Sequence, residues 1–295
     1  MKMKNLIVVA GATGNLGGRI CKELIRAGAQ VKAIVRSNSE KEKVDSLISM
    51  GVEIAIVTHF NKEELTAACK GAGCVVSAVT GLRDVIVDAQ LELLHAAIAA
   101  GVPRFIPSDF SSDFTGVPHG ENRNFDLRKE FQAHLNTSFI KATSIFNGCF
   151  ADILRYNTPL FNVQNQTIAY YDNKTDWKID FTTMDDTAAF TAKAALDPAT
   201  PRFLRIASFS VSPNDLVTLS ERYKAQKFKL VDMGSMEGFS AYNKIQRAQN
   251  PLGEQELYPR WQQAQYMYSM FLVHNEEIDN GRYPELAWSK VEDNI

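Results

Sequence analysis

Three glycines at a fixed spacing constrain the fold of this chain more than any other feature of its sequence. Gly11, Gly14 and Gly17 follow the apolar run at 5–10 and precede a helical pattern at 15–27. In such a turn the first glycine permits a tight bend, the second lets the backbone approach a pyrophosphate, and the third lets the helix pack on the strand. The helix N-terminus then offers free N–H groups to the phosphates. A plain strand-to-helix turn is the alternative, but the strand–helix setting favours dinucleotide binding.

The rest of the first half repeats the same strand–helix unit. Short apolar runs separated by helical patterns predict further strands at 31–36, 52–57, 73–79, 104–107 and 138–145. Asn61 and Glu64 predict a capping box at the start of one connecting helix. Alternation of this kind is typical of a parallel sheet with helices on both faces. We therefore expect an α/β fold built on a doubly wound parallel sheet.

The second half has a looser pattern. Short strands are expected within 167–171 and 177–182, and helices at 185–196, 214–226, 236–249 and 256–274. We read residues 1–150 as a nucleotide-binding domain and residues 151–295 as a smaller, mixed lobe that covers the substrate. No Gly-, Ser- or Pro-rich linker separates the two, so the boundary is approximate and the two parts are expected to pack as one body.

Composition narrows the classes of partner. The 295 residues are 45% apolar and carry a formal net charge of −2, with Lys and Arg scattered along the chain. This balance predicts no direct nucleic-acid or membrane binding. The apolar stretch near the start is too short for a signal peptide, which predicts a cytoplasmic protein. The four cysteines form no C-x-x-C pair and the five histidines show no ligand spacing. We expect reduced thiols and no metal site.

The end of the second predicted strand indicates which cofactor is bound. NAD-binding proteins tend to place an acidic residue there, about 20 positions after the glycines. This chain has Arg36, followed by Ser37. A guanidinium pairs with a 2′-phosphate through two parallel hydrogen bonds, whereas a carboxylate would repel it. The sequence therefore favours NADP(H) over NAD(H), the alternative for Arg36 being a solvated charge.

Other candidate cofactor contacts lie in the glycine turn and at the ends of later strands, where open α/β sheets hold their ligands. They are Thr13, Asn15, Leu16, Thr80, Gly81, Ser108, Asp109 and Phe110. For Asp109 a loop-capping role is as plausible as a ligand role.

Five stretches together resemble the NmrA-like family of atypical short-chain dehydrogenases, which includes enzymes similar to isoflavone reductase and phenylcoumaran benzylic ether reductase. They are GATGNLGGRI (11–20), VR (35–36), AAGVPRFIPSDF (99–110), SIFNGCFADIL (144–154) and RYPELAWSKVED (282–293). The resemblance runs nearly end to end. It implies a Rossmann domain with a small C-terminal lobe, NADPH in the cleft between them, and a substrate over the nicotinamide.

The chain departs from the family at the position where the family's reductases carry a lysine. The family pattern F-x-x-K is matched here by Phe125 and Arg128, so arginine replaces the lysine. Arginine stays protonated and cannot act as a base. Arg128 is expected to border the buried face of its helix, and the neighbouring Lys129 to face solvent. A second departure lies at 58–60, where Thr, His and Phe replace the family's acidic stretch near the adenine, so adenine contacts are not carried over.

Three weaker sets of candidates remain. His119 lies in a polar loop at 111–126 that could close over the nicotinamide, or it is simply solvated. Phe150, Trp177 and Phe181 could line an apolar substrate pocket or belong to the core. Tyr223 and Lys227 match the Y-x-x-x-K pair of ordinary short-chain dehydrogenases, but they lie too far past the sixth strand for a nicotinamide pocket.

Two functions from different classes fit these observations. The first is an NADPH-dependent reductase of a small aromatic or carbonyl-bearing molecule, with Arg128 stabilising a developing oxyanion and Lys129 and His119 as further catalytic candidates. The alternative is a non-catalytic NADP(H) sensor that acts through a protein partner, which the missing lysine favours. Reduction of a flavin or quinone is not distinguished from the first by sequence.

Overall fold

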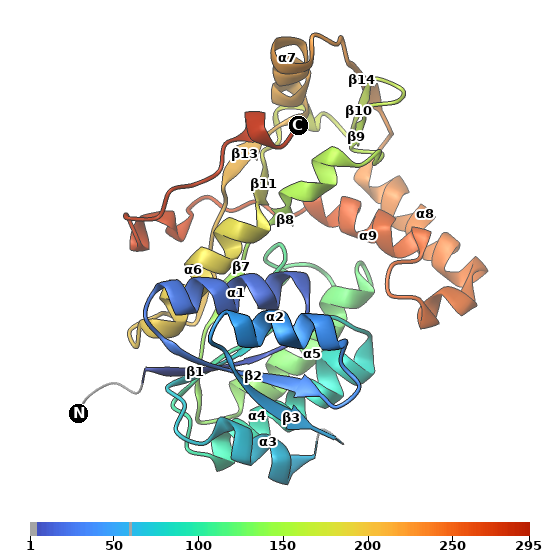
Figure 1. Cartoon of the computed structure of the whole chain (residues 1–295). Helices are drawn as coiled ribbons and strands as arrows, with labels where there is room; N and C mark the ends of the chain where they lie inside the picture. The colour runs from blue at the N-terminus through green and yellow to red at the C-terminus, as the bar shows by residue number, and fades with distance from the viewer. Residues whose placement is uncertain (1–4, 59–60) are drawn as a thin grey trace.

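A six-stranded parallel sheet forms the core of the first half of the chain (Figure 1). The computed structural model describes residues 5–58 and 61–295. The sheet has the order β3-β2-β1-β4-β5-β6. Its strands are β1 (Leu6–Ala10), β2 (Gln30–Arg36), β3 (Glu53–Val57), β4 (Cys74–Ser77), β5 (Arg104–Ile106) and β6 (Lys141–Ala142). This order, with β1 beside β4, places a crevice at the carboxyl ends of these two strands, where doubly wound sheets bind ligands.

Helices cover both faces of this sheet, as the alternation predicted. They are α1 (Asn15–Arg26), α2 (Lys41–Ser49), α3 (Lys62–Cys69), α4 (Gln90–Ala99), which continues the π-helix η1 (Asp84–Ala89), and α5 (Arg123–Asn136). Ile7 and Val9 on β1 share one buried cluster with α1 and α2. The alternate residues Val8 and Ala10 join a second cluster with α3, α4 and α5. The central strand is thus buried on both faces, which explains its continuous apolar run.

The rest of the chain, from Ser144 onward, forms small sheets and helices, much of which lies above the six-stranded sheet (Figure 1). Its strands are β7 (Ser144–Phe146), β8 (Cys149–Phe150), β9 (Phe161–Asn162), β10 (Thr167–Tyr170), β11 (Ile179–Thr182), β12 (Phe203–Arg205), β13 (Phe209–Val211) and β14 (Lys229–Asp232). Its α-helices are α6 (Met184–Leu196), α7 (Pro213–Lys224), α8 (Met236–Gln249) and α9 (Arg260–Met270). Short 3-10 helices lie at Ala151–Arg155, Lys174–Asp176, Pro251–Gln255, Asp279–Arg282 and Val291–Asp293.

The two halves also share a buried core. Helix α6 shares a buried cluster with α1 and the sheet, because Ala188 and Phe190 pack with Ile20 and Leu24. The division at residue 150 therefore stays a prediction about folding units, since part of the second half completes the core of the first.

The sixth predicted strand, at 138–145, is wrong in its extent. Only Lys141 and Ala142 pair with β5, whereas Ser144 begins β7, which pairs with β12 in a separate sheet. Thr143 marks the change of direction: its hydroxyl donates to the carbonyl of Pro201 at 2.9 Å. At this point the chain leaves the six-stranded sheet and enters the sheet of β7 and β12. The helix expected at 256–274 is also shorter, since α9 starts only after Pro259.

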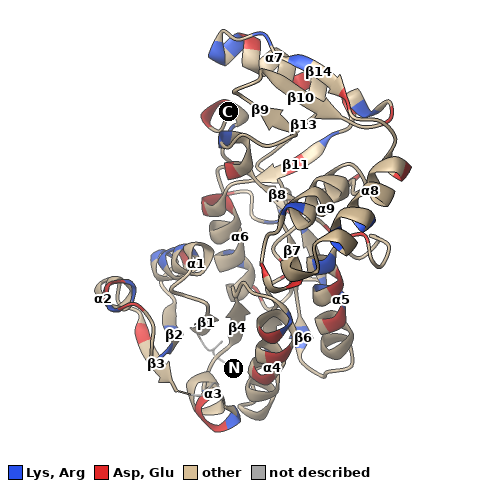
Figure 2. Cartoon of the chain, turned by 90° about the vertical axis from the view of Figure 1, so that its right-hand side faces the viewer, with Lys and Arg blue, Asp and Glu red and all other residues tan. Residues whose placement is uncertain are grey.

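The four cysteines are free, with Cys149 half-buried and the other three buried. Among the described residues, no helix is long and apolar enough to cross a membrane. In Figure 2 the ribbon segments of Lys and Arg and those of Asp and Glu are spread over many helices and strands.

Candidate cofactor and active site

The turn after β1 can be built only with glycine. Gly11 has φ of +81°, and a Cβ added to it would lie 2.4 Å from the carbonyl oxygen of Ala78, which follows β4. The Gly14 amide donates to the Gly11 carbonyl at 2.9 Å and closes the turn. Gly17 is buried, and its added Cβ would lie 2.2 Å from the same Gly11 oxygen. The glycines at the first and third positions therefore let β1, β4 and α1 approach one another closely.

The first turn of α1 offers unpaired backbone donors. Gly14 is the N-cap and provides no side-chain cap, and the first turn holds no acidic residue. The first helical amide with an acceptor is that of Gly18, which donates to Gly14. The preceding amides of Asn15, Leu16 and Gly17 have no acceptor in the part of the chain described. This arrangement fits a pyrophosphate, which free N–H groups and the helix dipole both favour.

The other residues of the turn line this cradle. Thr13 and Leu16 are half-buried, while Gly14 and Asn15 are exposed. The Asn15 side chain accepts a hydrogen bond from Arg19 Nε at 2.9 Å, so its carboxamide is already engaged.

Arg36 ends β2 with an exposed side chain, next to the exposed Ser37. Parallel pairing of β2 with β1 places this strand end at the same edge of the sheet as the glycine turn. Within residues 5–58 and 61–295, the guanidinium of Arg36 makes no ion pair or hydrogen bond. Arg36 is therefore a charge available to a phosphate. Thr58 donates its amide to Glu64, and the other two residues of the adenine departure, 59 and 60, lie outside the described residues.

The ends of β4 and β5 meet beside the cradle. Thr80 is exposed and Gly81 half-buried after β4, and an added Cβ at Gly81 would lie 2.4 Å from that of Val85. Ser108, after β5, donates its hydroxyl to the Val79 carbonyl at 2.7 Å. Phe110 is buried in the core against the sheet. Of this set, Thr80 and Gly81 remain accessible for contact with a cofactor.

Asp109 is completely buried and serves as an anchor within the protein. Its Oδ2 accepts hydrogen bonds from Ser144 Oγ at 2.6 Å and Gln132 Nε2 at 2.9 Å, whereas Oδ1 has no partner in the described structure. Burial raises the pKa of Asp109, an effect that these hydrogen bonds and the charges of Arg128 and Arg202 reduce. The contacts favour the loop-capping role over a direct cofactor contact.

Arg128 reaches the same edge of the sheet from α5. It is half-buried, as predicted, with Nε donating to the Ser108 carbonyl at 3.2 Å and Nη1 to the Asn124 carbonyl at 3.0 Å. Its Nη2 has no acceptor in the described part of the chain. The guanidinium is therefore held by two backbone carbonyls, with one nitrogen left for a ligand.

Lys129 and His119 lie elsewhere. The prediction that Lys129 faces solvent is wrong: the side chain is half-buried, and its ammonium donates to the Val117 carbonyl in the loop at 111–122. The side chain of His119 is 89% exposed, and its Nδ1 lies 3.3 Å from Asp126 Oδ1. Neither side chain is brought to the carbonyls that hold Arg128.

The three aromatic candidates for a substrate pocket lie in different surroundings. Phe181 is fully buried and stacks with Phe209 in the second lobe, so it belongs to the core. Trp177 is half-buried and donates its indole N–H to the Met270 carbonyl at 3.0 Å. Phe150 is half-buried at the end of β8 and packs against the core of the first half. Tyr223 lies on α7, at the far end of the second lobe from α1 in Figures 1 and 2.

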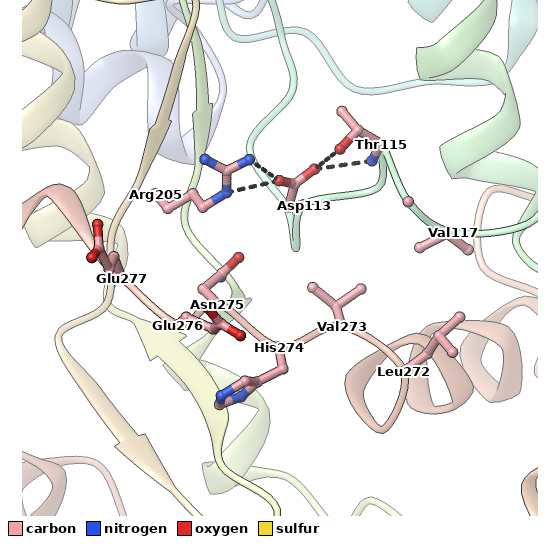
Figure 3. Close-up of a pocket in the computed structure, with 11 residues that line it drawn as sticks. Asp113, Thr115, Val117, Arg205, Leu272, Val273, His274, Asn275, Glu276 and Glu277 are labelled. Atoms are coloured by element: carbon pink, nitrogen blue, oxygen red, sulfur yellow. Dashed lines mark hydrogen bonds and ion pairs between the residues drawn. The ribbon is translucent and has the colours of Figure 1, made fainter.

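Sequence reasoning missed a cavity of about 490 Å³ between the loop at 113–117 and the segment at 272–277. Asp113 pairs with Arg205 at 2.6 Å across one wall, and Val117, Leu272 and Val273 provide an apolar side (Figure 3). None of its described lining residues belongs to the glycine turn or to the surroundings of Arg128. The cavity is thus separate from the cofactor cradle, and no motif in the sequence marked it.

Comparison with known proteins places this arrangement in a family. The model of the NmrA-like family matches residues 3–290. The chain belongs to the NmrA-like family. This result confirms the resemblance found in the sequence.

Several of the similar proteins carry the names of reductases. Pinoresinol reductase 2 of Arabidopsis thaliana is 31% identical over 212 residues, which cover 67% of this chain and 66% of that protein, just under two thirds of its length. A solved structure described as AtPrR2 with NADP+ and (+)pinoresinol superposes with a TM-score of 0.80 at 24% identity, covering 99% of this chain and 98% of that one. Isoflavone reductase gives a TM-score of 0.80 at 20% identity, covering 98% of each chain. These two structures confirm the Rossmann-type fold of this NmrA-like chain.

Proposed function

We propose that this NmrA-like protein is an NADPH-dependent oxidoreductase that reduces a small aromatic substrate bearing a carbonyl or benzylic ether. One observation carries the proposal: an uncapped helix N-terminus over a glycine turn shares a sheet edge with the unpaired Arg36. The similarity to pinoresinol reductase 2, and to a structure with NADP+ and (+)pinoresinol, supports it. A cytoplasmic location stays a prediction.

In this proposal each end of the cofactor has its own residues. The amides at Asn15–Gly17 bind the pyrophosphate, and Arg36 with Ser37 binds the 2′-phosphate. Thr80 and Gly81 lie at the nicotinamide end. The bound cofactor supplies a hydride, the chemistry that the protein itself lacks.

Arg128 acts at the reacting end. A substrate that accepts a hydride at carbon develops negative charge on its oxygen, and a fixed guanidinium stabilises that charge. Its free Nη2 is the group that would donate to the oxygen. Lys129 fastens the loop at 111–122 through Val117, and Phe150 is the aromatic candidate left to contact a substrate.

A turnover screen tests the proposal. Purified protein is mixed with NADPH and a panel of aromatic aldehydes, ketones, enones and benzylic ethers that includes pinoresinol, and loss of NADPH absorbance is followed together with product formation. We expect NADPH-dependent reduction of at least one compound. Tight NADPH binding with no turnover across the panel, together with a stoichiometric protein partner, would instead support the sensor, which the comparisons do not support.

A further inference from the structure

The arginine at the family's lysine position leaves the reaction without an obvious proton donor. Reduction at carbon requires a proton at the oxygen, and Arg128 cannot release one near neutral pH. The ammonium of Lys129 is bound to the Val117 carbonyl, and His119 is exposed beside Asp126. A donor near Arg128 must therefore come from another element.

The phenol of Tyr266 on α9 is oriented by α5, the helix that carries Arg128. Asn124 Nδ2 donates to the Tyr266 hydroxyl oxygen at 3.1 Å. The orientation of this carboxamide is fixed at both ends, since its Oδ1 accepts from Arg123 Nε at 3.0 Å and its Nδ2 also reaches the Leu257 carbonyl at 3.4 Å. The hydroxyl oxygen thus accepts, and no acceptor within the described ranges takes its proton. That proton is available to a ligand.

Asn124 also connects Tyr266 to Arg128. Its backbone carbonyl accepts a hydrogen bond from Arg128 Nη1, and its side chain donates one to the phenol, so a single residue of α5 contacts both groups. The half-buried Tyr266 ring meets Phe125 edge-on at 5.5 Å between centroids. Arg123 lies within electrostatic reach of Tyr266. The Tyr266 hydroxyl oxygen therefore lies beside an amide donor and within reach of one guanidinium.

We propose that Tyr266 is the proton donor of the reaction, in partnership with Arg128, in place of the lysine found in the family. The inference rests on the proposed reductase function. The substrate carbon gains a hydride, and the electron pair of its C=O π bond, or of the cleaved benzylic C–O bond, moves to the oxygen. That oxygen takes the Tyr266 proton while Arg128 stabilises its charge, and the phenolate regains a proton from water.

Tyr258 provides a matched control. Its ring lies 6.3 Å from that of Tyr266, and its side chain is 50% exposed. No hydrogen bond orients its hydroxyl in the described structure. The charge of Arg128 also reaches this phenol, so Tyr258→Phe tests a second tyrosine near Arg128 without disturbing the contact between Tyr266 and Asn124.

The test compares Tyr266→Phe, Tyr258→Phe and Arg128→Lys/Tyr266→Phe on each panel compound that the wild type reduces. We expect Tyr266→Phe to lower kcat about a hundredfold or more, as for loss of a general acid, with NADPH affinity and thermal midpoint unchanged. Tyr258→Phe should retain kcat within about threefold. The double variant should recover at least about tenfold over Tyr266→Phe, because a lysine can donate the proton.

A binding measurement supplies a readout independent of turnover. With NADP+ bound, the same compounds should bind about two- to tenfold more weakly to Tyr266→Phe than to the wild type, since one hydrogen bond is lost, and equally well to Tyr258→Phe. Undiminished kcat in Tyr266→Phe, or a loss confined to Tyr258→Phe, would overturn the assignment. So would a Tyr266→Phe protein that loses NADPH affinity and thermal stability together. A wild type that reduces nothing would reject the proposed function itself.

Discussion

The proposed cofactor cradle and the proposed reacting end of this protein are built in opposite ways. The cradle is made of backbone from one short segment, Gly11 to Gly17, and its amides at Asn15, Leu16 and Gly17 have no partner in the described structure. The reacting end is made of side chains from α5 and α9, and these are partly paired with each other and with the backbone carbonyls of Ser108 and Asn124. An anion that binds at the cradle therefore accepts hydrogen bonds from amides that are otherwise unpaired. Binding at the reacting end adds to a network that is already hydrogen-bonded.

The largest expected effect tests the backbone cradle. Gly17→Ala places a Cβ 2.2 Å from the Gly11 carbonyl oxygen, so α1 must shift away from the turn. The amides at its N-terminus then no longer point together at the pyrophosphate. We expect the Kd for NADPH to rise about a hundredfold, roughly 2.7 kcal/mol. Gly18→Ala is the control, since its Cβ would lie 3.3 Å from the Ala12 oxygen and alanine favours the helix. Equal Kd values for both variants by titration calorimetry would show that close approach at Gly17 is not required.

The second prediction tests the reacting end. Arg128→Ala removes the guanidinium while leaving the cradle intact, so kcat should fall about a hundredfold, as when one oxyanion donor is lost. NADPH affinity should stay within about threefold. Steady-state kinetics on an active panel compound measures kcat, and calorimetry measures the affinity for NADPH. If Arg128→Ala weakened NADPH binding and left kcat intact, the division between the regions would be wrong.

The contrast also explains which parts could be predicted from the sequence. The glycine turn is local: its pattern, the preceding strand and the following helix lie within 5–27, and each glycine has a steric reason to be there. The first five strands follow from short apolar runs for the same reason. The sixth strand was predicted too long because Thr143 hydrogen-bonds to Pro201, a residue far along the chain that the local pattern does not include.

The reacting end could not be read in the same way. Asn124 and Tyr266 are 142 positions apart, and no local pattern announces their hydrogen bond. Lys129 was expected to face solvent from helical periodicity alone, which does not include the loop carbonyl that it meets. Phe181 resembled a pocket residue by type but is core by packing. Side-chain networks between distant segments need the tertiary structure.

The smallest predicted effect concerns Asp109, the anchor beneath the reacting end. Burial raises its pKa, so the folded chain holds the proton more tightly than the unfolded chain. This contribution is fully present below the ordinary value of 3.8 and is lost as pH rises through the higher folded pKa. Asp109→Asn does not ionise and avoids that loss. Its stability relative to the wild type should therefore rise with pH above 3.8 and then level off. Urea unfolding at several pH values measures this, and a constant difference would contradict a buried ionising carboxylate.

Cofactor choice tests the central claim most directly, because it depends on one charge at the edge of the cradle. Arg36 is exposed and unpaired in the described structure, and a charge-assisted contact with a 2′-phosphate contributes roughly 1.5 to 3 kcal/mol. Titration calorimetry of the wild type and Arg36→Ala with NADPH and NADH should show NADPH bound at least about tenfold more tightly by the wild type. The variant should lose most of that preference and keep its affinity for NADH. Equal affinities in the wild type, or a variant that loses both cofactors alike, would contradict the proposal that this protein selects NADPH through Arg36.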